Sequence, residues 1–281
     1  MRVWERKFGS RRPPNHQKCA PSAVRLTGAL TESIRDRYEA AHDDGRPLIG
    51  GHRGNPAQHP ENTLRSFRSA IAAGCDLIEC DVHLSSDSRL IVIHDHTLDR
   101  TTNGKGLVRD HTAAELRRLD AGQGEHLPLL QEVIELALGK VGLVIEIKQI
   151  PIQYPGLEEK LVAMLRQLGA VQECAVVSFY HPSLKVLRAM EPKLQLGLLE
   201  GARPIEPARM MRDAGADVYS PHWGAMDPPL VKEIHAAGGA VAVWPVDDDA
   251  AVAWCRVCKP DSIFTNRPVE IGAALRAAAE S

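Results

Sequence analysis

From Leu48 onward, short apolar runs alternate with longer stretches of helical periodicity, and this alternation limits the possible folds more than any other feature. Runs that are apolar throughout are typical of strands buried on both faces, as in a parallel sheet covered by helices. Eight or so strand-then-helix units over about 230 residues match the size and order of a TIM barrel. The strand-like runs are Leu48–Gly51, Asp76–Val82, Leu90–His94, Leu143–Ile147, Cys174–Phe179, Leu196–Leu199, Val218–Ser220, Ala240–Val246 and Ser262–Thr265.

We therefore predict an α/β fold, a TIM (β/α)8 barrel over residues 46–281. A doubly wound open sheet is the alternative, but no G-x-G-x-x-G motif follows the first strand. The segment between His94 and Pro128 breaks the alternation and predicts a small insertion after the second barrel strand. The predicted helices are Asn62–Ala73, Leu129–Leu138, Leu157–Leu168, Pro182–Met190, Pro207–Ala214, Pro228–Ala237, Asp249–Val257 and Pro268–Ala279.

Residues 1–45 form a predicted N-terminal extension. Residues 1–30 are charged, broken by prolines and without periodicity, so we expect them to be irregular. A possible helix spans residues 31–43, with Thr31 as its N-cap and Gly45 beyond its end. The extension is basic but lacks the apolar segment of a secretory signal, which favours a cytoplasmic location.

Composition excludes several classes of function. The net charge is −2 and only 4% of the 281 residues are aromatic, which argues against a nucleic-acid partner. No apolar run approaches the roughly 20 residues that span a bilayer, so we expect no stable membrane insertion. The single C-x-x-C pair, Cys255 and Cys258, has no further zinc ligands nearby, so buried, inert thiols are expected. The oligomeric state is left open.

Acidic residues gather near the predicted C-terminal ends of the strands, where TIM-barrel active sites are built. Glu79 and Asp81 lie two residues apart, and therefore on one face of a strand; Glu146 and Lys148 do the same on a later strand. Three carboxylates that converge on one barrel mouth repel one another unless a cation lies among them. Ligation by oxygen alone favours a hard ion, Mg²⁺ or Ca²⁺.

Two histidines also follow strand-like runs, His52 and His94. Because imidazole titrates near neutral pH, such a pair can divide proton acceptance and donation. Arg53 and Lys148 would supply positive charge for an anion such as a phosphodiester. His83 is an alternative fourth metal ligand.

Several short motifs occur in a fixed order along the chain. They are His52-Arg53-Gly54, followed after five residues by Pro60-Glu61-Asn62-Thr63, then Glu79-Cys80-Asp81-Val82, Ile93-His94-Asp95, Thr97-Leu98-Asp99-Arg100-Thr101-Thr102-Asn103-Gly104, Ile145-Glu146-Ile147-Lys148, Ser178-Phe179, Val243-Trp244 and Phe264-Thr265-Asn266-Arg267-Pro268. This order resembles the glycerophosphodiester phosphodiesterase family, most closely its compact cytosolic bacterial members. The resemblance covers about residues 48–270.

The resemblance implies a TIM barrel that hydrolyses glycerophosphodiesters to sn-glycerol 3-phosphate and an alcohol, with a divalent cation, Mg²⁺ or Ca²⁺. It implies metal ligands at Glu79, Asp81 and Glu146, and a catalytic pair at His52 and His94. A cyclic phosphate intermediate is expected, with direct attack by water as the other route. The resemblance favours His52 as the proton acceptor, while the order of the two histidines stays open.

Further residues are assigned by the same resemblance. Glu61 and Asn62 would support the metal site, although capping of the following helix is the alternative. The substrate-binding residues would be Arg53, Lys148, Phe179 and Trp244.

The sequence departs from the family pattern at two places. Gln149 stands where a proline is usual, and Asp247 stands where an asparagine is usual. Neither change removes a proposed ligand or histidine, so they bear on rate and substrate preference. The alternatives are a phosphodiesterase acting on a lysophospholipid or on a sugar or inositol phosphodiester, and a non-catalytic barrel.

Overall fold

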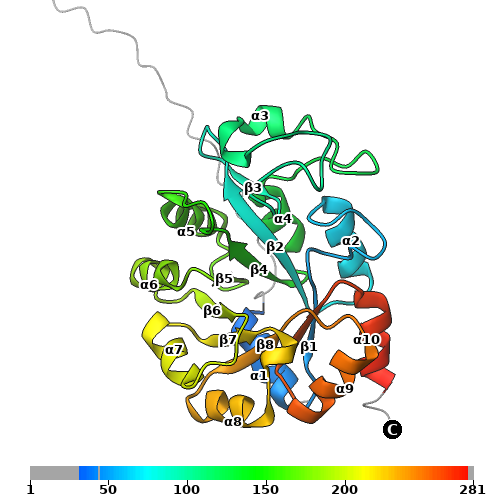
Figure 1. The fold of residues 1–281 in the computed structure, drawn as a ribbon, viewed down its shortest axis with the longest axis vertical. Helices are drawn as coiled ribbons and strands as arrows, with labels where there is room; N and C mark the ends of the chain where they lie inside the picture. Colours follow the sequence, from blue (N-terminus) through cyan, green and yellow to red (C-terminus); the bar gives the residue numbers. More distant parts are fainter. Residues whose placement is uncertain (1–31, 44, 278–281) are drawn as a thin grey trace, which may run out of the picture. The chain divides into compact units, whose positions relative to one another are not determined.

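The computed structural model describes residues 32–43 and 45–277. Within them, strands occupy the centre and helices surround them (Figure 1). Eight strands pair in parallel, and the ring closes because β1 pairs with both β2 and β9. The strands of this barrel are β1 (Leu48–Gly51), β2 (Leu77–Leu84), β4 (Gly142–Ile147), β5 (Cys174–Ser178), β6 (Gln195–Glu200), β7 (Val218–Pro221), β8 (Ala240–Val243) and β9 (Ser262–Thr265). The predicted TIM barrel is confirmed, and the open sheet is wrong.

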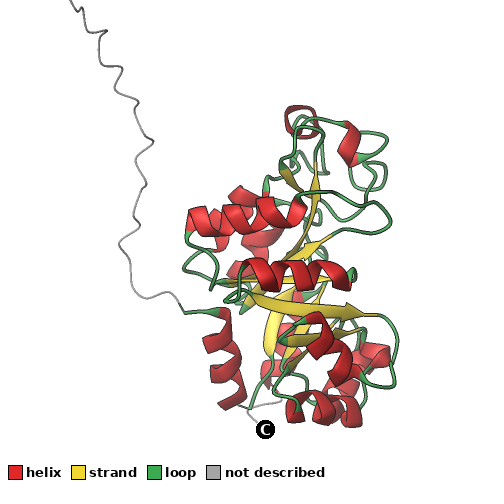
Figure 2. Ribbon diagram, turned by 90° about the vertical axis from the view of Figure 1, so that its left-hand side faces the viewer, coloured by secondary structure: helices red, strands yellow, loops and turns green. Residues whose placement is uncertain are grey.

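Helices cover the outside of the strands, as Figure 2 shows. Every residue of β2 and of β4 is buried, as expected for strands that face the barrel interior on one side and helices on the other. The helices are α1 (Ile34–Asp43), α2 (Leu64–Ala72), α3 (Ala113–Leu116), α4 (Leu130–Ala137), α5 (Leu157–Leu168), α6 (His181–Met190), α7 (Pro207–Ala214), α8 (Pro228–Ala236), α9 (Asp249–Cys258) and α10 (Pro268–Ala277).

The apolar run Leu90–His94 is not a parallel barrel strand. Its strand, β3 (Leu90–Val92), pairs antiparallel with β2, with Val82 opposite Val92 and Leu84 opposite Leu90. The reason is the short connection between β2 and β3. A parallel pair needs a crossover of about a dozen residues, whereas residues 85–89 are long enough only for a turn between antiparallel strands. Pairing with β3 also lengthens β2, which ends at Leu84, two residues beyond the predicted end at Val82.

The insertion after β3 forms a small structure of its own beyond the end of β2 (Figure 1). It contains α3 and a 3-10 helix, η1 (Val108–Asp110). A second 3-10 helix, η2 (Trp223–Ala225), follows β7. The insertion's apolar cluster is separate from the barrel core and contains Ile91, Ile93, Leu98, Val108, Ala113, Leu116, Ala121 and Leu127.

Helix α1 packs against the N-terminal ends of the strands. Ile34 is fully buried in one cluster with Leu48, at the start of β1. The Tyr38 hydroxyl lies 2.9 Å from the Ser262 hydroxyl, at the start of β9. The predicted N-cap, Thr31, lies outside the described residues, and Gly45 adopts a left-handed φ of +65° two residues after the helix ends.

Among the described residues, Ser33 makes a capping interaction at the start of α1. Its hydroxyl accepts a hydrogen bond from the backbone N–H of Asp36 at 3.1 Å, and the Asp36 carboxylate accepts one from the Ser33 N–H at 2.9 Å. This reciprocal pair is the pattern of a capping box and fixes where the helix begins.

The expectation of buried thiols is met among the described residues. No helix there is both long and apolar enough to cross a membrane. The five described cysteines are all buried: Cys75, Cys80, Cys174, Cys255 and Cys258. Burial raises the pKa of the Cys255 thiol to about 12 and that of Cys258 to about 11, so both thiols stay protonated and inert at neutral pH.

The packing of α1 predicts a cost for truncating Ile34. Ile34→Ala should lower the free energy of unfolding by about 2–5 kcal/mol, because it removes a fully buried side chain between the helix and the strand ends. Urea denaturation followed by circular dichroism measures this. Val186→Ala, at a side chain of α6 that is 43% exposed, is the control and should cost less than about 0.5 kcal/mol. Equal stabilities of the two variants would contradict the packing of α1.

Candidate active site

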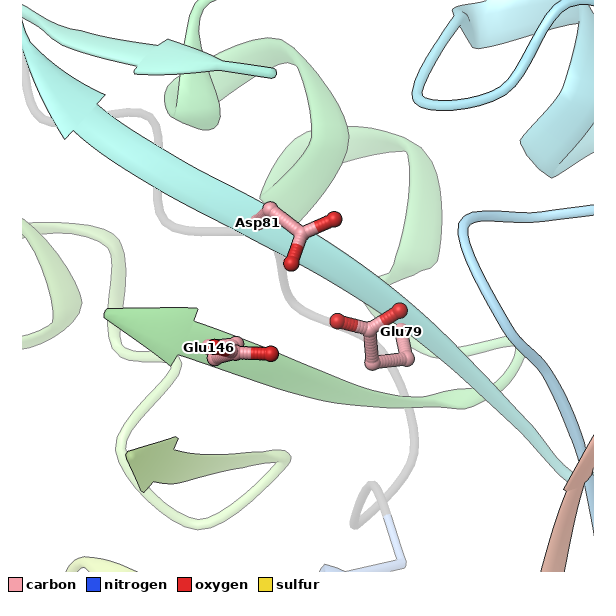
Figure 3. A group of neighbouring side chains, drawn as sticks. All are labelled: Glu79, Asp81 and Glu146. Atoms are coloured by element: carbon pink, nitrogen blue, oxygen red, sulfur yellow. The ribbon is translucent and has the colours of Figure 1, made fainter. Parts of the chain in front are cut away.

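Three buried carboxylates meet between two neighbouring barrel strands. Glu79 and Asp81 lie on β2 and Glu146 lies on β4, where the strand register places Asp81 beside Glu146. Figure 3 shows the three side chains pointing toward one another. One oxygen from each lies within 4.8 Å of one oxygen from each of the others. The expected acidic cluster is therefore assembled.

Burial makes this cluster electrostatically costly. Burial raises the pKa of Glu79 well above its ordinary value, and the charges of Asp81 and Glu146 raise it further. Burial likewise raises the pKa of Glu146. Burial also acts to raise the pKa of Asp81, but Lys148 and Arg53 outweigh it and lower that pKa. The three groups are therefore not all ionised unless more positive charge is added.

The donor set fits a hard divalent cation. Glu79 Oε1 is buried and has no hydrogen-bond partner, which is costly unless an ion uses its lone pairs. Carboxylate oxygens are the ligands that Mg²⁺ and Ca²⁺ prefer. Residues 32–43 and 45–277 contain one group of acidic, histidine or cysteine side chains close enough to share an ion, and it is Glu79, Asp81 and Glu146.

The two predicted phosphate-binding cations lie against the same carboxylates. Lys148 Nζ is 2.9 Å from Asp81 Oδ1 and 2.5 Å from Glu146 Oε1. Arg53 Nε is 3.4 Å from Asp81 Oδ2. Both cations therefore balance the acidic cluster in this structure, and a bound phosphate would give them a second anion to contact.

The turn after β1 places Arg53 by an unusual backbone conformation. Arg53 has a left-handed φ of +56°, and its N–H donates to Glu79 Oε2 at 2.9 Å. Gly54 follows with a φ of +90°, and a Cβ at Gly54 would lie 2.4 Å from the Ser66 hydroxyl oxygen. Only glycine fits there, which explains the His-Arg-Gly order. Strain of this kind concentrates at functional sites.

Asn62 contacts the acidic cluster, and its neighbour Thr63 caps the helix. Asn62 Nδ2 donates to Asp81 Oδ2 at 2.8 Å, and Asn62 Oδ1 accepts from the Asp81 N–H at 3.3 Å. The Thr63 hydroxyl accepts from the Ser66 N–H and is the N-cap of α2. The N-cap of α2 is therefore Thr63 and not Asn62, whose side chain contacts Asp81 instead.

His52 and His94 line one cavity with Glu79 and Glu146. His52 Nε2 lies 3.9 Å from Glu79 Oε2, and its Nδ1 lies 2.9 Å from Asn266 Oδ1. Burial lowers the pKa of His52 to about 4, with the charge of Arg53 acting in the same direction. A histidine in this environment is neutral at pH 7.

His94 is held by a carboxylate. Its Nδ1 lies 2.7 Å from Asp95 Oδ1. Arg100 donates to both oxygens of Asp95 and to both oxygens of Glu61. Glu61 also accepts from Arg53 Nη1 at 3.0 Å. Glu61 therefore connects Arg53 to Arg100, which holds the partner of His94.

The interpretation of His83 as a fourth ligand is wrong. Its Nδ1 lies 2.9 Å from the Tyr154 hydroxyl and its Nε2 lies 2.9 Å from the His94 carbonyl oxygen. Both ring nitrogens are used, so neither is available to a metal. His83 instead fixes the backbone at His94.

The site opens into a cavity of about 470 Å³. Phe179 and Trp244 stand at right angles in it, with ring centroids 5.4 Å apart. Trp244 is fixed by its indole N–H, which donates to the Ser220 carbonyl oxygen at 3.0 Å. The two predicted substrate-binding aromatics thus form an apolar wall beside the histidines. Below them the lining is small and apolar, at Val144, Ala175, Val177, Gly197, Val218 and Ala242.

Sequence reasoning did not assign the partners of the two histidines. Asn266, Asp95 and Arg100 all lie in quoted motifs, but no role followed from their residue types. The missing information is spatial: Asn266 is 214 residues from His52. The first and last strands of a closed barrel must pair, and this pairing, with Gly51 beside Thr265, brings His52 and Asn266 together. It is the feature from which their contact could have been inferred.

Comparison with known proteins gives a consistent result. Residues 52–270 match the model of the Glycerophosphoryl diester phosphodiesterase family. A glycerophosphodiester phosphodiesterase of Caldanaerobacter subterraneus subsp. tengcongensis is 38% identical over 231 residues, which are 79% of this chain and 95% of that protein. One of Bacillus altitudinis is 34% identical, over 78% of this chain and 94% of its own length.

Solved structures are similar as well. An Oleispira antarctica phosphodiesterase, solved in complex with the product sn-glycerol-3-phosphate, is 30% identical with a TM-score of 0.74, over 84% of this chain and 99% of its own. A glycerophosphodiester phosphodiesterase from Agrobacterium tumefaciens is also 30% identical, with a TM-score of 0.72 over 81% and 99% of the two chains.

The carboxylate cluster predicts stabilisation by divalent cations. Mg²⁺ or Ca²⁺ at about 100 times its dissociation constant should stabilise the fold by about 2.7 kcal/mol, because it binds the folded state alone. Thermal denaturation with and without the cation measures this. Glu146→Gln should remove most of the shift, while Glu159→Gln, an exposed acid on α5, should keep it. A shift that survives Glu146→Gln would place the ion elsewhere.

Proposed function

Because the chain belongs to the Glycerophosphoryl diester phosphodiesterase family, we propose that it hydrolyses glycerophosphodiesters to sn-glycerol 3-phosphate and an alcohol. As a member of that family it is a phosphoric diester hydrolase. The observation that carries the proposal is the acidic cluster flanked by two histidines in one cavity. The product bound to the Oleispira antarctica relative supports the same product here.

Glu79, Asp81 and Glu146 would hold a divalent cation, Mg²⁺ or Ca²⁺. When bound, such an ion neutralises phosphate charge and lowers the pKa of a nearby hydroxyl. Arg53 and Lys148 would bind the phosphate oxygens from the side of the acidic cluster. The wall of Phe179 and Trp244 would contact the carbon face of the glycerol.

The two histidines would move protons in opposite directions. His52 Nε2 would accept the proton of the glycerol 2-hydroxyl, whose oxygen attacks phosphorus and forms a cyclic phosphate. His94 would protonate the departing alcohol, and water would then open the ring with the two roles reversed. Intramolecular attack gains up to roughly 7–11 kcal/mol from proximity.

The partners of the histidines support this order. A carboxylate at Nδ1 stabilises an imidazolium, and His94 has Asp95 at that position. An amide oxygen carries no full charge, and His52 has Asn266 there. A second cavity, of about 330 Å³, also adjoins His94 and is lined by His96, Thr97 and Ile150. It offers room for the alcohol that His94 would protonate.

The apolar lining supports a second candidate, a phosphodiesterase acting on a lysophospholipid. The main cavity reaches past the aromatic wall to Tyr38 of α1, between small apolar side chains. Its volume of about 470 Å³ lies in the range of pockets that bury a drug-sized ligand. A glycerol with an apolar substituent would use this lining, whereas free glycerol would not.

A substrate panel tests the proposal. Glycerophospho-choline, -ethanolamine, -glycerol and -inositol and lysophosphatidylcholine are assayed for glycerol 3-phosphate or lysophosphatidate, with and without EDTA. We expect cleavage of at least one glycerophosphodiester, abolished by EDTA and restored by Mg²⁺ or Ca²⁺. A 2-deoxy analogue should resist cleavage, because it lacks the attacking hydroxyl. Inactivity toward all five with metal present would refute the proposal.

Replacement of His94 tests its role as proton donor. His94→Ala should lower kcat on glycerophosphocholine by about 10²–10⁴-fold, because the alkoxide then leaves without a proton. The loss should be much smaller on glycerol 3-phosphate p-nitrophenyl ester, whose leaving group needs no proton. Arg109→Ala, at an exposed side chain of the insertion, is the control and should match the parent on both substrates. Equal losses on both substrates would exclude His94 as the donor.

A further inference from the structure

A carboxylate that no step above uses lies behind His52. His52 Nδ1 is 2.9 Å from Asn266 Oδ1, and Asn266 Nδ2 donates to Asp247 Oδ2 at 2.6 Å. Asp247, Asn266 and His52 follow β8, β9 and β1, three adjacent strands of the ring. Their side chains form one hydrogen-bonded row that ends at the acidic cluster.

Asp247 is held so that both its oxygens accept. Oδ1 accepts from the Asn266 N–H at 2.7 Å and from the Thr265 hydroxyl at 3.0 Å, and Oδ2 accepts from Asn266 Nδ2. An amide side chain can present either its oxygen or its nitrogen to a neighbour. Since a carboxylate only accepts, Asp247 forces the nitrogen of Asn266 toward itself and the oxygen toward His52.

We propose that Asp247 is a positioning residue that sets the tautomer of His52 through Asn266. An amide oxygen at Nδ1 keeps the proton on Nδ1, so Nε2 keeps a free lone pair toward the acidic cluster. An amide nitrogen in the same place would select the opposite tautomer, with the proton on Nε2. That form could not accept a proton from a hydroxyl. The effect on turnover rests on the proposed function, whereas the effect on the tautomer does not.

The isosteric change Asp247→Asn is the sharpest test. The oxygen of the new amide at position 247 should stay where Asp247 Oδ1 now lies, because the Thr265 hydroxyl and the Asn266 N–H both donate to that position. Its nitrogen then meets the Asn266 nitrogen, donor against donor, so the Asn266 side chain turns over. We expect the His52 proton to move from Nδ1 to Nε2, as read from two-bond ¹H–¹⁵N spectra of ¹⁵N-histidine-labelled protein.

The kinetic expectation follows from the tautomer. Asp247→Asn should lower kcat by about 10²-fold or more and leave KM unchanged, because it disables a general base without touching a substrate contact. Asp249→Asn, an exposed acid in the first turn of α9, is the matched control. It should change neither the spectrum nor kcat. The His52 signals are identified by their loss in His52→Gln.

A double substitution separates positioning from a structural role. In Asp247→Asn with Asn266→Asp, the new amide at 247 can donate to the new carboxylate at 266. That carboxylate accepts from His52 Nδ1–H, so the original tautomer returns. We expect the double variant to return the His52 proton to Nδ1 and to recover part of the kcat lost by Asp247→Asn, since the carboxylate at 266 also favours the imidazolium form. Loss of folding alone would not be repaired in this way.

The outcomes are distinct. The inference is overturned if Asp247→Asn keeps the Nδ1 proton on His52, or if the double variant fails to restore it. If the parent protein cleaves no glycerophosphodiester, the proposed function fails, and the spectra still decide the role of Asp247. A changed tautomer in the single variant that reverts in the double variant supports the inference whether or not turnover is seen.

Discussion

The repulsion among three buried carboxylates is the constraint around which the site is organised. Adjacent parallel strands lie about 4.8 Å apart, so residues in register, such as Asp81 and Glu146, cannot move away from each other without breaking the sheet. The surrounding groups compensate: Lys148 and Arg53 bring positive charge, and the Arg53 N–H and the Asn62 amide bring donors. One oxygen of Glu79 is left without a hydrogen-bond donor, and a divalent cation would supply the missing positive charge. The proposed metal site thus depends on the β2–β4 register.

Much of the fold and of the chemistry could be predicted because both depend on local patterns. The uniform burial of β2 and β4 follows from apolar runs, and the shared face of Glu79 and Asp81 follows from their spacing. The direction of β3 could not be read from its composition, because an apolar run has the same residues in either orientation; only the short link to β2 decides it. The prediction of His83 as a metal ligand was wrong for another reason. Sharing a strand face with two ligands did not prevent Tyr154 and the His94 carbonyl from taking both its nitrogens.

The two histidines illustrate what sequence cannot supply. Their residue type and position follow from motifs, but their difference lies in what contacts Nδ1. Asp95 is adjacent in the chain to His94, whereas Asn266 reaches His52 only through closure of the ring. A charged partner stabilises a protonated imidazole more than a neutral partner does, so the two partners act differently on the pKa of the two histidines. The proposed acid and base roles therefore depend on the partner at each Nδ1, and no local pattern reveals the partner of His52.

Closure of the ring between β1 and β9 also determines when each part of the site becomes complete during synthesis of the chain. The acidic cluster draws only on β2 and β4, which are complete by residue 147, while the amide that holds His52 arrives with the last strand. A nascent chain that has emerged only as far as its middle therefore contains all three carboxylates and His94 with its partner Asp95, yet His52 has no partner for its Nδ1. The two histidines thus acquire their partners at different stages of synthesis, and only a chain that extends through Asn266 supplies both.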